Sequence, residues 1–306
     1  SRNSKSPLLR CVPLVLILIA WSDVFTHEPR QNPTVPRSVY DPDLVRTKLA
    51  MKPQPERDGS RLMLSPEAAL GLMRFATSNA MNNFLAKRTG YCANVNLLDH
   101  VPKVDGFFSL SPHEFDTLLT LIYSVGNGNW SRLEDFMGVS QITAPGKMLE
   151  WQSRPDFLPL VTAGVKPVFL DDTNTLWSFG RNDFDGRKMV FLPPETKPFV
   201  AITNETPVRI LRSDFSNGTA DIEVNAPEKS LVVLAQSYYH NWKVTVDGEP
   251  ADVLRANFAF MAVQVPKGMH SIYFYYRDDA FKRGWNITLA SLVICVAGLL
   301  FWREKI

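Results

Sequence analysis

Cysteine is scarce in this sequence, and its placement excludes a fold held together by disulfides. The chain has 3 cysteines among its 306 residues. Cys11 and Cys295 lie inside apolar stretches at the two ends, so Cys92 is the one cysteine of the polar part. A single thiol cannot form an internal disulfide. The region between the ends must therefore be stabilised by packing, which a chain of this length can supply.

Sequence motifs of common catalytic sites are also missing. There is no Walker loop, no GxSxG elbow and no CxxC pair, and the 5 histidines lack the spacing of zinc ligands. Two Asp-x-Asp runs, Asp41-Pro-Asp43 and Asp183-Phe-Asp185, carry carboxylates of the kind that bind Mg or Mn. Aspartate beside proline or glycine is equally typical of turns, and no third ligand is evident. We therefore predict no metal site, no cofactor held by this chain and no catalytic residue.

Charge of one sign is not in excess, whereas apolar residues are concentrated at the two ends. With 33 basic and 31 acidic residues, the net charge of +2 predicts no nucleic-acid partner. The apolar stretches cover residues 7–25 and 285–302. A transmembrane helix needs roughly 17 to 25 mainly apolar residues, and Trp285 and Trp302 bound the second stretch like an aromatic belt. We predict two transmembrane helices and the lipid bilayer as a partner.

Two features of the ends complicate this prediction. Arg10 interrupts the first stretch, so a secretory signal peptide is the alternative there. The positive-inside rule places basic outer flanks in the cytoplasm and the region between them outside. Lys282 and Arg283, on the predicted outer side, oppose that orientation. The basic residues of the outer flanks are Arg2, Lys5, Arg10, Arg303 and Lys305.

Local patterns between the ends predict an α+β fold. Residues 26–64 are rich in proline and charge and are predicted to be a linker. Residues 65–198 are predicted to form an extracytoplasmic α/β domain, with a helix start at Ser65-Pro66 and a capping box from Ser111 to Glu114. Two apolar helix faces and five short strands are expected in this domain. The faces are Leu70, Met73, Met81, Phe84 and Leu85, and then Phe115, Leu118, Leu119 and Ile122; the strands are VSQIT, PLV, KPVFL, KMVFL and PFVAI.

The stretch 231–276 has the alternation of strands that are buried on one face. Val244 and Val246 alternate with polar residues, and Ile272 and Phe274 do the same further on. Similar alternation is expected from residue 261 to residue 266. Turn residues lie at 217–218, 247–248 and 267–268. Residues 199–280 are therefore predicted to form a β-sandwich domain.

The same stretch carries a family resemblance. The runs YYHNWKVTVDG and LRANFAFMAVQVPKGMHSIYF resemble the C-terminal extracytoplasmic domain of YfhO-type bacterial membrane proteins. That family usually has Tyr-Tyr-Pro-Gly-Trp-Lys, then a Val-Asp-Gly turn, then Arg-Ala-Asn. This chain departs at His240-Asn241, where Pro-Gly is usual, and the segments 32–40 and 101–110 are similar more loosely. The residues it keeps are Tyr238, Tyr239, Trp242, Lys243, Asp247, Gly248, Arg255, Ala256, Asn257, Gly268 and His270.

The resemblance implies a function as well as a location. YfhO-type proteins resemble the GT-C class of multi-pass membrane glycosyltransferases, which take sugars from polyprenyl-phosphate donors with an acidic residue in an early extracytoplasmic loop. This implies the bacterial cell membrane, transfer to a cell-envelope acceptor, and a catalytic part upstream of this chain that adds further transmembrane segments as partners. The alternatives are a non-catalytic module that binds a glycan, lipid-linked sugar or partner protein, and a structural brace for the membrane bundle.

Residues near the kept motifs are the candidates for binding. They are Tyr238, Tyr239, His240, Lys243, Arg255 and Asn257. The neighbouring Trp242 has two interpretations. Its phase with Val244 and Val246 favours a place in the core, while Tyr238 and Tyr239 beside it are typical of a platform on which a sugar stacks.

Overall fold

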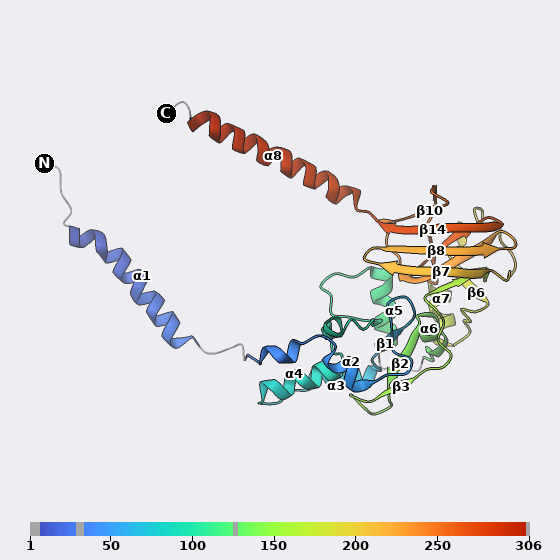
Figure 1. Ribbon diagram of the computed structural model, residues 1–306, viewed down its shortest axis with the longest axis horizontal. Helices are drawn as coiled ribbons and strands as arrows, with labels where there is room; N and C mark the ends of the chain where they lie inside the picture. The colour runs from blue at the N-terminus through green and yellow to red at the C-terminus, as the bar shows by residue number, and fades with distance from the viewer. Residues whose placement is uncertain (1–6, 29–33, 125–127, 304–306) are drawn as a thin grey trace.

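The computed structural model describes residues 7–28, 34–124 and 128–303. Arg2, Lys5, Asn32 and Lys305 lie outside these ranges. The mixed α+β composition is confirmed, with helices concentrated before residue 181 and strands after residue 208. Figure 1 shows a central body from which one long helix extends at each end of the chain. Both helices lie on the same side of that body in this view.

The C-terminal helix α8 (Asp279–Arg303) is long and apolar enough to cross a membrane, over its part Asp279–Leu300. None of that part is buried against the body. A helix that is apolar all round and unburied fits a lipid environment. The N-terminal helix α1 (Pro7–His27) has a shorter apolar part, Val12–His27, so it falls below that length. Of the two predicted transmembrane helices, the C-terminal one therefore has the length and composition that a membrane span needs.

The N-terminal part of the body is built from short elements. They are η1 (Arg37–Tyr40), α2 (Leu44–Leu49), β1 (Arg61–Met63), α3 (Pro66–Arg74), α4 (Ala80–Thr89), η2 (Val95–Asp99), α5 (His113–Tyr123), α6 (Ser131–Phe136), β2 (Val139–Thr143), β3 (Trp151–Ser153), β4 (Val161–Ala163), β5 (Lys166–Phe169), α7 (Asp172–Gly180), β6 (Met189–Leu192) and η3 (Pro194–Thr196). Strands β1, β2 and β3 form one small sheet, and β5 pairs with β6 in parallel.

Several sequence predictions can be checked in this part. Ser65 caps α3 by accepting a hydrogen bond from the Ala68 amide, as predicted. The single apolar face predicted from Leu70 to Leu85 was wrong. Helix α3 ends at Arg74 with Phe75 as its C-cap, and α4 begins after its cap Asn79, so the two helices do not continue one helical phase. The capping box was also wrong, since Pro112 and not Ser111 is the cap of α5. The predicted strand PFVAI forms no strand, although Val200 and Ile202 in it are buried.

The C-terminal part of the body consists of strands. They are β7 (Arg209–Ser216), β8 (Thr219–Ala226), β9 (Ser230–Ser237), β10 (Trp242–Val246), β11 (Glu249–Ala251), β12 (Leu254–Ala256), β13 (Phe260–Val265) and β14 (Gly268–Tyr276). One sheet has the order β11-β10-β14-β8-β7, and a second has the order β12-β13-β9-β4. The turn at Asp247-Gly248 has positive φ at both residues, 55° and 85°, as a tight hairpin between β10 and β11 requires.

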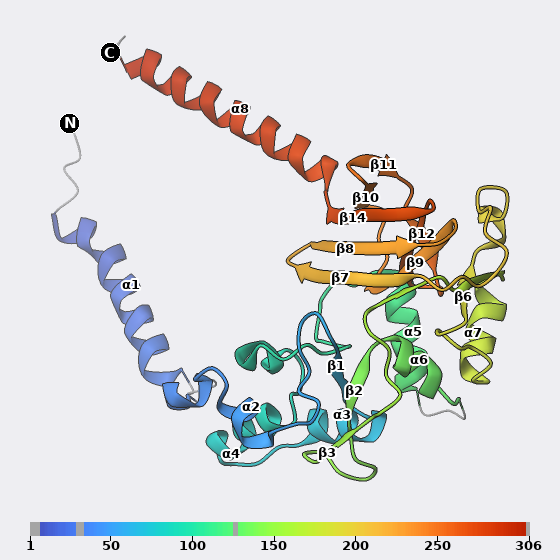
Figure 2. The ribbon, with the colours of Figure 1, turned by 45° about the vertical axis from the view of Figure 1, so that its right-hand side comes forward.

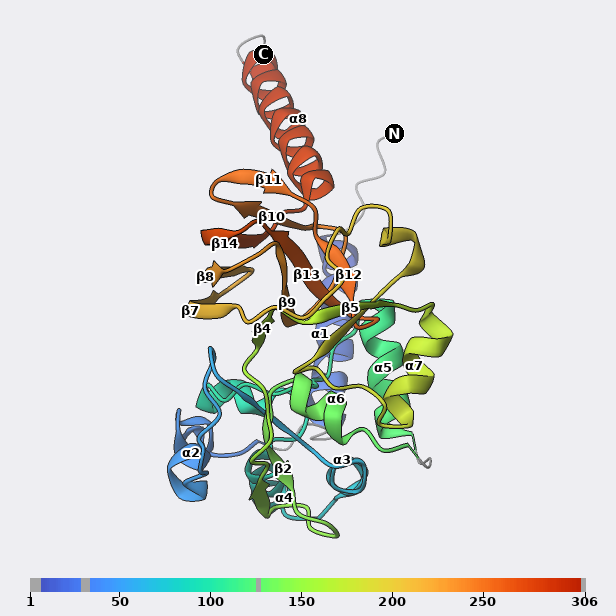
Figure 3. The same ribbon diagram turned by 90° about the vertical axis from the view of Figure 1, so that its right-hand side faces the viewer.

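The two sheets face each other across one apolar cluster. Ile222, Ile272 and Phe274 project into it from the five-stranded sheet, and Leu234 and Val263 project into it from the four-stranded sheet. The alternation predicted around Ile272 and Phe274 is confirmed, because both are buried in β14 while Ser271 and Tyr273 are exposed, and in β8 every second residue is buried. Figure 3 shows the two sheets at the end of the body from which α8 rises, with the β1–β3 sheet and α3 at the opposite end.

The four-stranded sheet is buried on both faces, which the sequence did not predict for β13. Phe260 and Ala262 pack into a second cluster together with Leu118 of α5 and Phe136 of α6. The N-terminal part therefore covers the face of β13 that was expected to be wet. Strand β4, from the range predicted for the α/β domain, pairs with β9 from the range predicted for the sandwich. The boundary at residues 198–199 stays a prediction.

Candidate functional site

An open groove lies where β9, β10 and β14 approach the start of α5. Its volume is about 320 Å³, and it is lined by Leu110, Ser111, Pro112, Ser237, Tyr239, Trp242 and Tyr276. Tyr276 is the last residue of β14, and only Arg277 and Asp278 separate it from α8. The groove is therefore at the base of the helix that can cross a membrane.

Strand pairing and aromatic contacts position the three rings of this groove. Trp242 pairs with Tyr276 in the β10–β14 register, and their rings meet edge to face at 5.8 Å between centroids. The ring of Tyr239 is nearly parallel to that of Tyr276, at 6.5 Å. The amide of Trp242 donates a hydrogen bond to the carbonyl of Tyr239, which closes the turn between β9 and β10. Strand register and ring contacts therefore bring the three rings together at this groove.

Trp242 lies at the edge of the core and also borders the groove. Its side chain is partly buried and packs against the cluster between the two sheets, so it contributes to the core. The same side chain also lines the groove. Aromatic rings with apolar faces, combined with the hydroxyls of Ser111, Ser237 and the two tyrosines, suit a ligand that has both C–H faces and hydroxyl groups.

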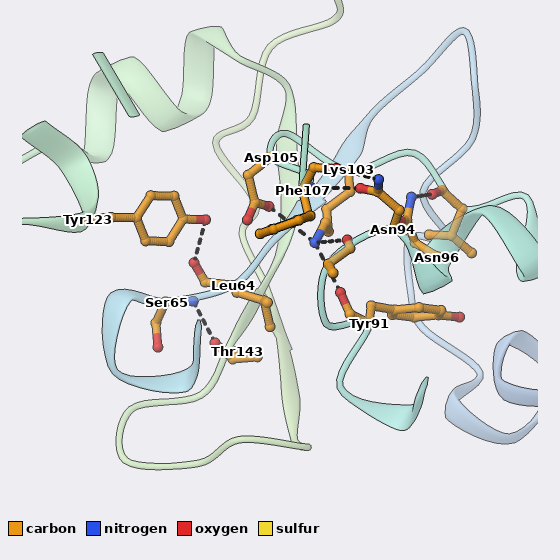
Figure 4. Close-up of polar contacts among 12 residues, drawn as sticks. Leu64, Ser65, Tyr91, Asn94, Asn96, Lys103, Asp105, Phe107, Tyr123 and Thr143 are labelled. Atoms are coloured by element: carbon orange, nitrogen blue, oxygen red, sulfur yellow. Dashed lines mark hydrogen bonds and ion pairs between the residues drawn. The ribbon is translucent and has the colours of Figure 1, made fainter. Parts of the chain in front are cut away.

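The segment 101–110 leads to the groove, which Leu110 at its end helps to line, and polar contacts fix this segment to the body (Figure 4). The buried Lys103 ammonium donates to the carbonyls of Tyr91 at 3.0 Å and Ala93 at 2.7 Å, and it lies 3.5 Å from Asp105 Oδ1. Tyr91 and Ala93 both have positive φ, so Lys103 satisfies the carbonyls of a strained turn. The Asn94 side chain accepts from the Phe107 amide and donates to the Phe107 carbonyl, both at 2.7 Å.

Burial governs the ionisation of this anchoring cluster. It lowers the pKa of Lys103, and the attraction of Asp105 partly opposes that effect. Burial also raises the pKa of Tyr123 well above its ordinary value, with Asp105 adding to the rise. The Tyr123 hydroxyl donates to the Leu64 carbonyl at 3.1 Å. Lys103 and Tyr123 are both bound to backbone carbonyls, so their arrangement positions the loop.

The structure brings only some of the predicted binding residues to the groove. Tyr239 lines it, and His240 lies beside Tyr239 at 4.1 Å between ring centroids. Tyr238 packs partly buried against the cluster between the sheets. Lys243 is exposed on β10 and is not part of the lining.

Arg255 and Asn257 lie at the turn between β12 and β13, against β6 and α7. Arg255 pairs with Asp172 of α7 at 2.8 Å and donates to the Phe258 carbonyl at 3.0 Å. Asn257 is 1% exposed; its side-chain Oδ1 accepts from the Phe191 amide, and its backbone N–H donates to the Phe191 carbonyl. These contacts hold β6 to the sheets. Whether either residue binds a ligand stays a prediction.

The far wall of the groove was not predicted from the sequence. Leu110, Ser111 and Pro112 reach it from a distant part of the chain, and only a structure could show that juxtaposition. Tyr276 was inside the recognised stretch but was not named among the candidates for binding. No group of three or more His, Cys, Asp or Glu residues within the described ranges is arranged to hold a metal ion.

Part of this chain matches the model of a known protein family. A search of curated proteins found no counterpart for this chain. Residues 195–288 match the family model described as bacterial membrane protein YfhO, and these residues include β7 to β14 and the first turns of α8. The C-terminal region of this chain, with most of the groove, is of the YfhO type.

Proposed function

We propose that this chain is the extracytoplasmic C-terminal region of a multi-pass, GT-C-like membrane glycosyltransferase. In this proposal the groove holds the sugar of a polyprenyl-phosphate donor or of a cell-envelope acceptor, while the catalytic carboxylate belongs to the upstream part of the protein. The observation that carries the proposal is the position of three aromatic rings, Tyr239, Trp242 and Tyr276, directly at the base of α8. A lipid-linked sugar is confined to the membrane surface, so its binding site should open there.

The proposal includes an architecture. We infer that the two facing sheets act as one β-sandwich domain, because they share a single apolar cluster. We also infer that α1 is a second span. Its side chains from Val12 to Phe25 are exposed and almost all apolar. A reporter fused after Ile306 tests the orientation. Activity typical of the cytoplasm supports it, and activity typical of the extracytoplasmic side contradicts it.

The function can be tested by sugar transfer in membrane vesicles that contain the complete protein. The vesicles are supplied with a radiolabelled polyprenyl-phosphate hexose, and incorporation into the envelope fraction is measured. Tyr276→Ala removes one wall of the groove and should lower transfer severalfold. Tyr273→Ala is the matched control, because Tyr273 is 42% exposed, close to the 44% of Tyr276, on the same strand but outside the groove.

The same assay separates the proposal from the alternative of a structural brace. If the region only braces the membrane bundle, Tyr276→Ala and Tyr273→Ala should have equal effects on transfer when the two variants accumulate to equal levels. A loss that is specific to Tyr276→Ala shows that the groove participates in transfer. The chain by itself, without the upstream part, should not transfer the sugar, and turnover by the purified chain would contradict our assignment of the catalytic carboxylate.

A further inference from the structure

Three large apolar side chains are exposed within the loop that leads into α5. Phe107 is 74% exposed, Phe108 is 64% exposed, and Leu110, at 93%, is the most exposed large apolar side chain of the described residues. Single exposed apolar residues are normal on a protein surface, but neighbouring ones form a patch that usually has a partner. This loop therefore requires an explanation that its own packing does not give.

The backbone of the loop is held in place while its side chains are exposed. Asn94 binds both the amide and the carbonyl of Phe107. Lys103 is fixed in turn to the carbonyls of Tyr91 and Ala93 (Figure 4). These hydrogen bonds do not offset the unfavourable free energy of exposing Phe107 and Phe108 to water. They fix the direction in which the loop leaves the body, so its position beside a partner is determined in advance.

The loop is continuous with the base of α8. Leu110 lines the same groove as Tyr276, and β14 leads into α8 directly after Tyr276. In Figure 1 and Figure 2 the segment that enters α5 lies on the side of the body from which α8 leaves. Phe281 and Trp285, in the first two turns of α8, are exposed as well.

The length of α8 places the membrane surface close to this loop. At about 1.5 Å per residue, its 25 residues span about 38 Å, which exceeds a hydrocarbon core of about 30 Å. The first turns, with Lys282 and Arg283, therefore lie at the level of the headgroups, and Trp285 lies at the boundary where tryptophan is enriched. Apolar groups on a protein surface can enter this boundary to a depth of about 5 to 10 Å.

We propose that Phe107, Phe108 and Leu110 insert into the leaflet that α8 enters and form a second contact of the body with the bilayer. The partner is lipid, because the patch is continuous with a helix whose own apolar surface begins at the same level. Two points of contact, α8 and the loop, fix the tilt of the body on the membrane. The groove between them then opens along the membrane surface. This inference does not depend on which ligand the groove binds.

The test uses the full chain with Cys11, Cys92 and Cys295 replaced by serine. Phe107→Cys is labelled with an environment-sensitive NBD fluorophore and reconstituted into vesicles of phosphatidylethanolamine and phosphatidylglycerol. Phe199→Cys is the matched control, because Phe199 is also 74% exposed but belongs to the segment between β6 and β7, at the right of Figure 2, away from α8. Phe108→Cys is a second position in case the first variant folds poorly.

The proposal predicts that the label at position 107 emits at shorter wavelength than the label at 199. It should be quenched by doxyl groups on the lipid chains and protected from aqueous iodide. Adding Asn94→Ala should weaken the quenching by doxyl lipids, because the loop loses its fixed direction. Equal access of iodide to both positions would overturn the proposal. Protection from both iodide and doxyl lipids would also overturn it, since a protein surface would then cover the loop.

Discussion

The replacement of Asn257 by alanine tests whether the Arg-Ala-Asn motif stabilises the fold. Asn257 Oδ1 accepts a hydrogen bond from the buried amide of Phe191 at 2.8 Å. Leaving a buried donor without a partner costs about 1 to 3 kcal/mol. Asn257 also has a φ of 46°, a conformation that costs alanine about 1 to 2 kcal/mol. Asn257→Ala should therefore lower the free energy of unfolding by about 2 to 5 kcal/mol, from a typical total of about 5 to 15 kcal/mol.

Thermal unfolding followed by circular dichroism measures this loss. For a body of this size, the Tm falls by about 2 to 4 °C for each kcal/mol of stability lost, so the Tm of Asn257→Ala should be lower by about 4 to 20 °C. Asn257→Gly loses the hydrogen bond but tolerates the positive φ, so its Tm should lie between those of the parent and Asn257→Ala. Asn225→Ala, at an exposed position of β8, should melt like the parent. An Asn257→Ala variant that melts like the parent would refute the structural role and favour the predicted role in binding.

Three further changes test the account. Arg88→Met should lower the free energy of unfolding by about 3 to 5 kcal/mol in urea, because Asp99, at 2.8 Å from Arg88 and fully buried, would lose its partner; an unchanged midpoint would contradict this. Hydrogen bonds from His270 and the Ser271 amide lower the pKa of Asp247 from its ordinary 3.8. The contribution of ionised Asp247 to the free energy of unfolding is therefore complete above pH 3.8, and it is lost as the pH falls through the lower pKa of the folded state. Asp247→Asn should thus be less stable than the parent near neutral pH and approach it in acid, and a pH-independent difference between their urea midpoints would count against this linkage. Trp242→Ala should lower the Tm by less than Phe274→Ala, since Trp242 is only partly buried in the cluster where Phe274 is fully buried; the reverse order would show that Trp242 is the stronger core residue.

Local chemistry made parts of this fold predictable. The hairpins at Asn217-Gly218 and Asp247-Gly248 have positive φ at Gly218, Asp247 and Gly248, and Gly and Asp are among the residues that adopt it most readily. The alternation of β14 gives Ile272 and Phe274 to the core, because the other face of this strand meets solvent. The cap at Ser65 follows from its side chain and the proline after it.

Contacts between distant segments could not be predicted in this way. β13 is buried on both faces because α5 and α6 cover it, and its own residues do not specify that cover. The groove likewise joins Leu110 and Pro112 to Tyr276 across the fold, so Tyr239 and Trp242 are the lining residues that the sequence had pointed to. Arg255 and Asn257 were interpreted as binding residues from their polarity and their place in the motif, whereas their contacts with Asp172 and Phe191 become visible only in the folded chain.

The most direct test of the central claim is a covalent capture of the sugar in the groove. A benzophenone-bearing phenylalanine replaces Tyr276 in the complete protein, and Tyr273 receives the same replacement as the control. Vesicles with a radiolabelled polyprenyl-phosphate hexose are then illuminated, and the protein is separated and counted. The account predicts a labelled adduct from position 276 and little from position 273. Equal labelling at both positions, or none at position 276 while transfer continues, would contradict the claim that this groove binds the lipid-linked sugar.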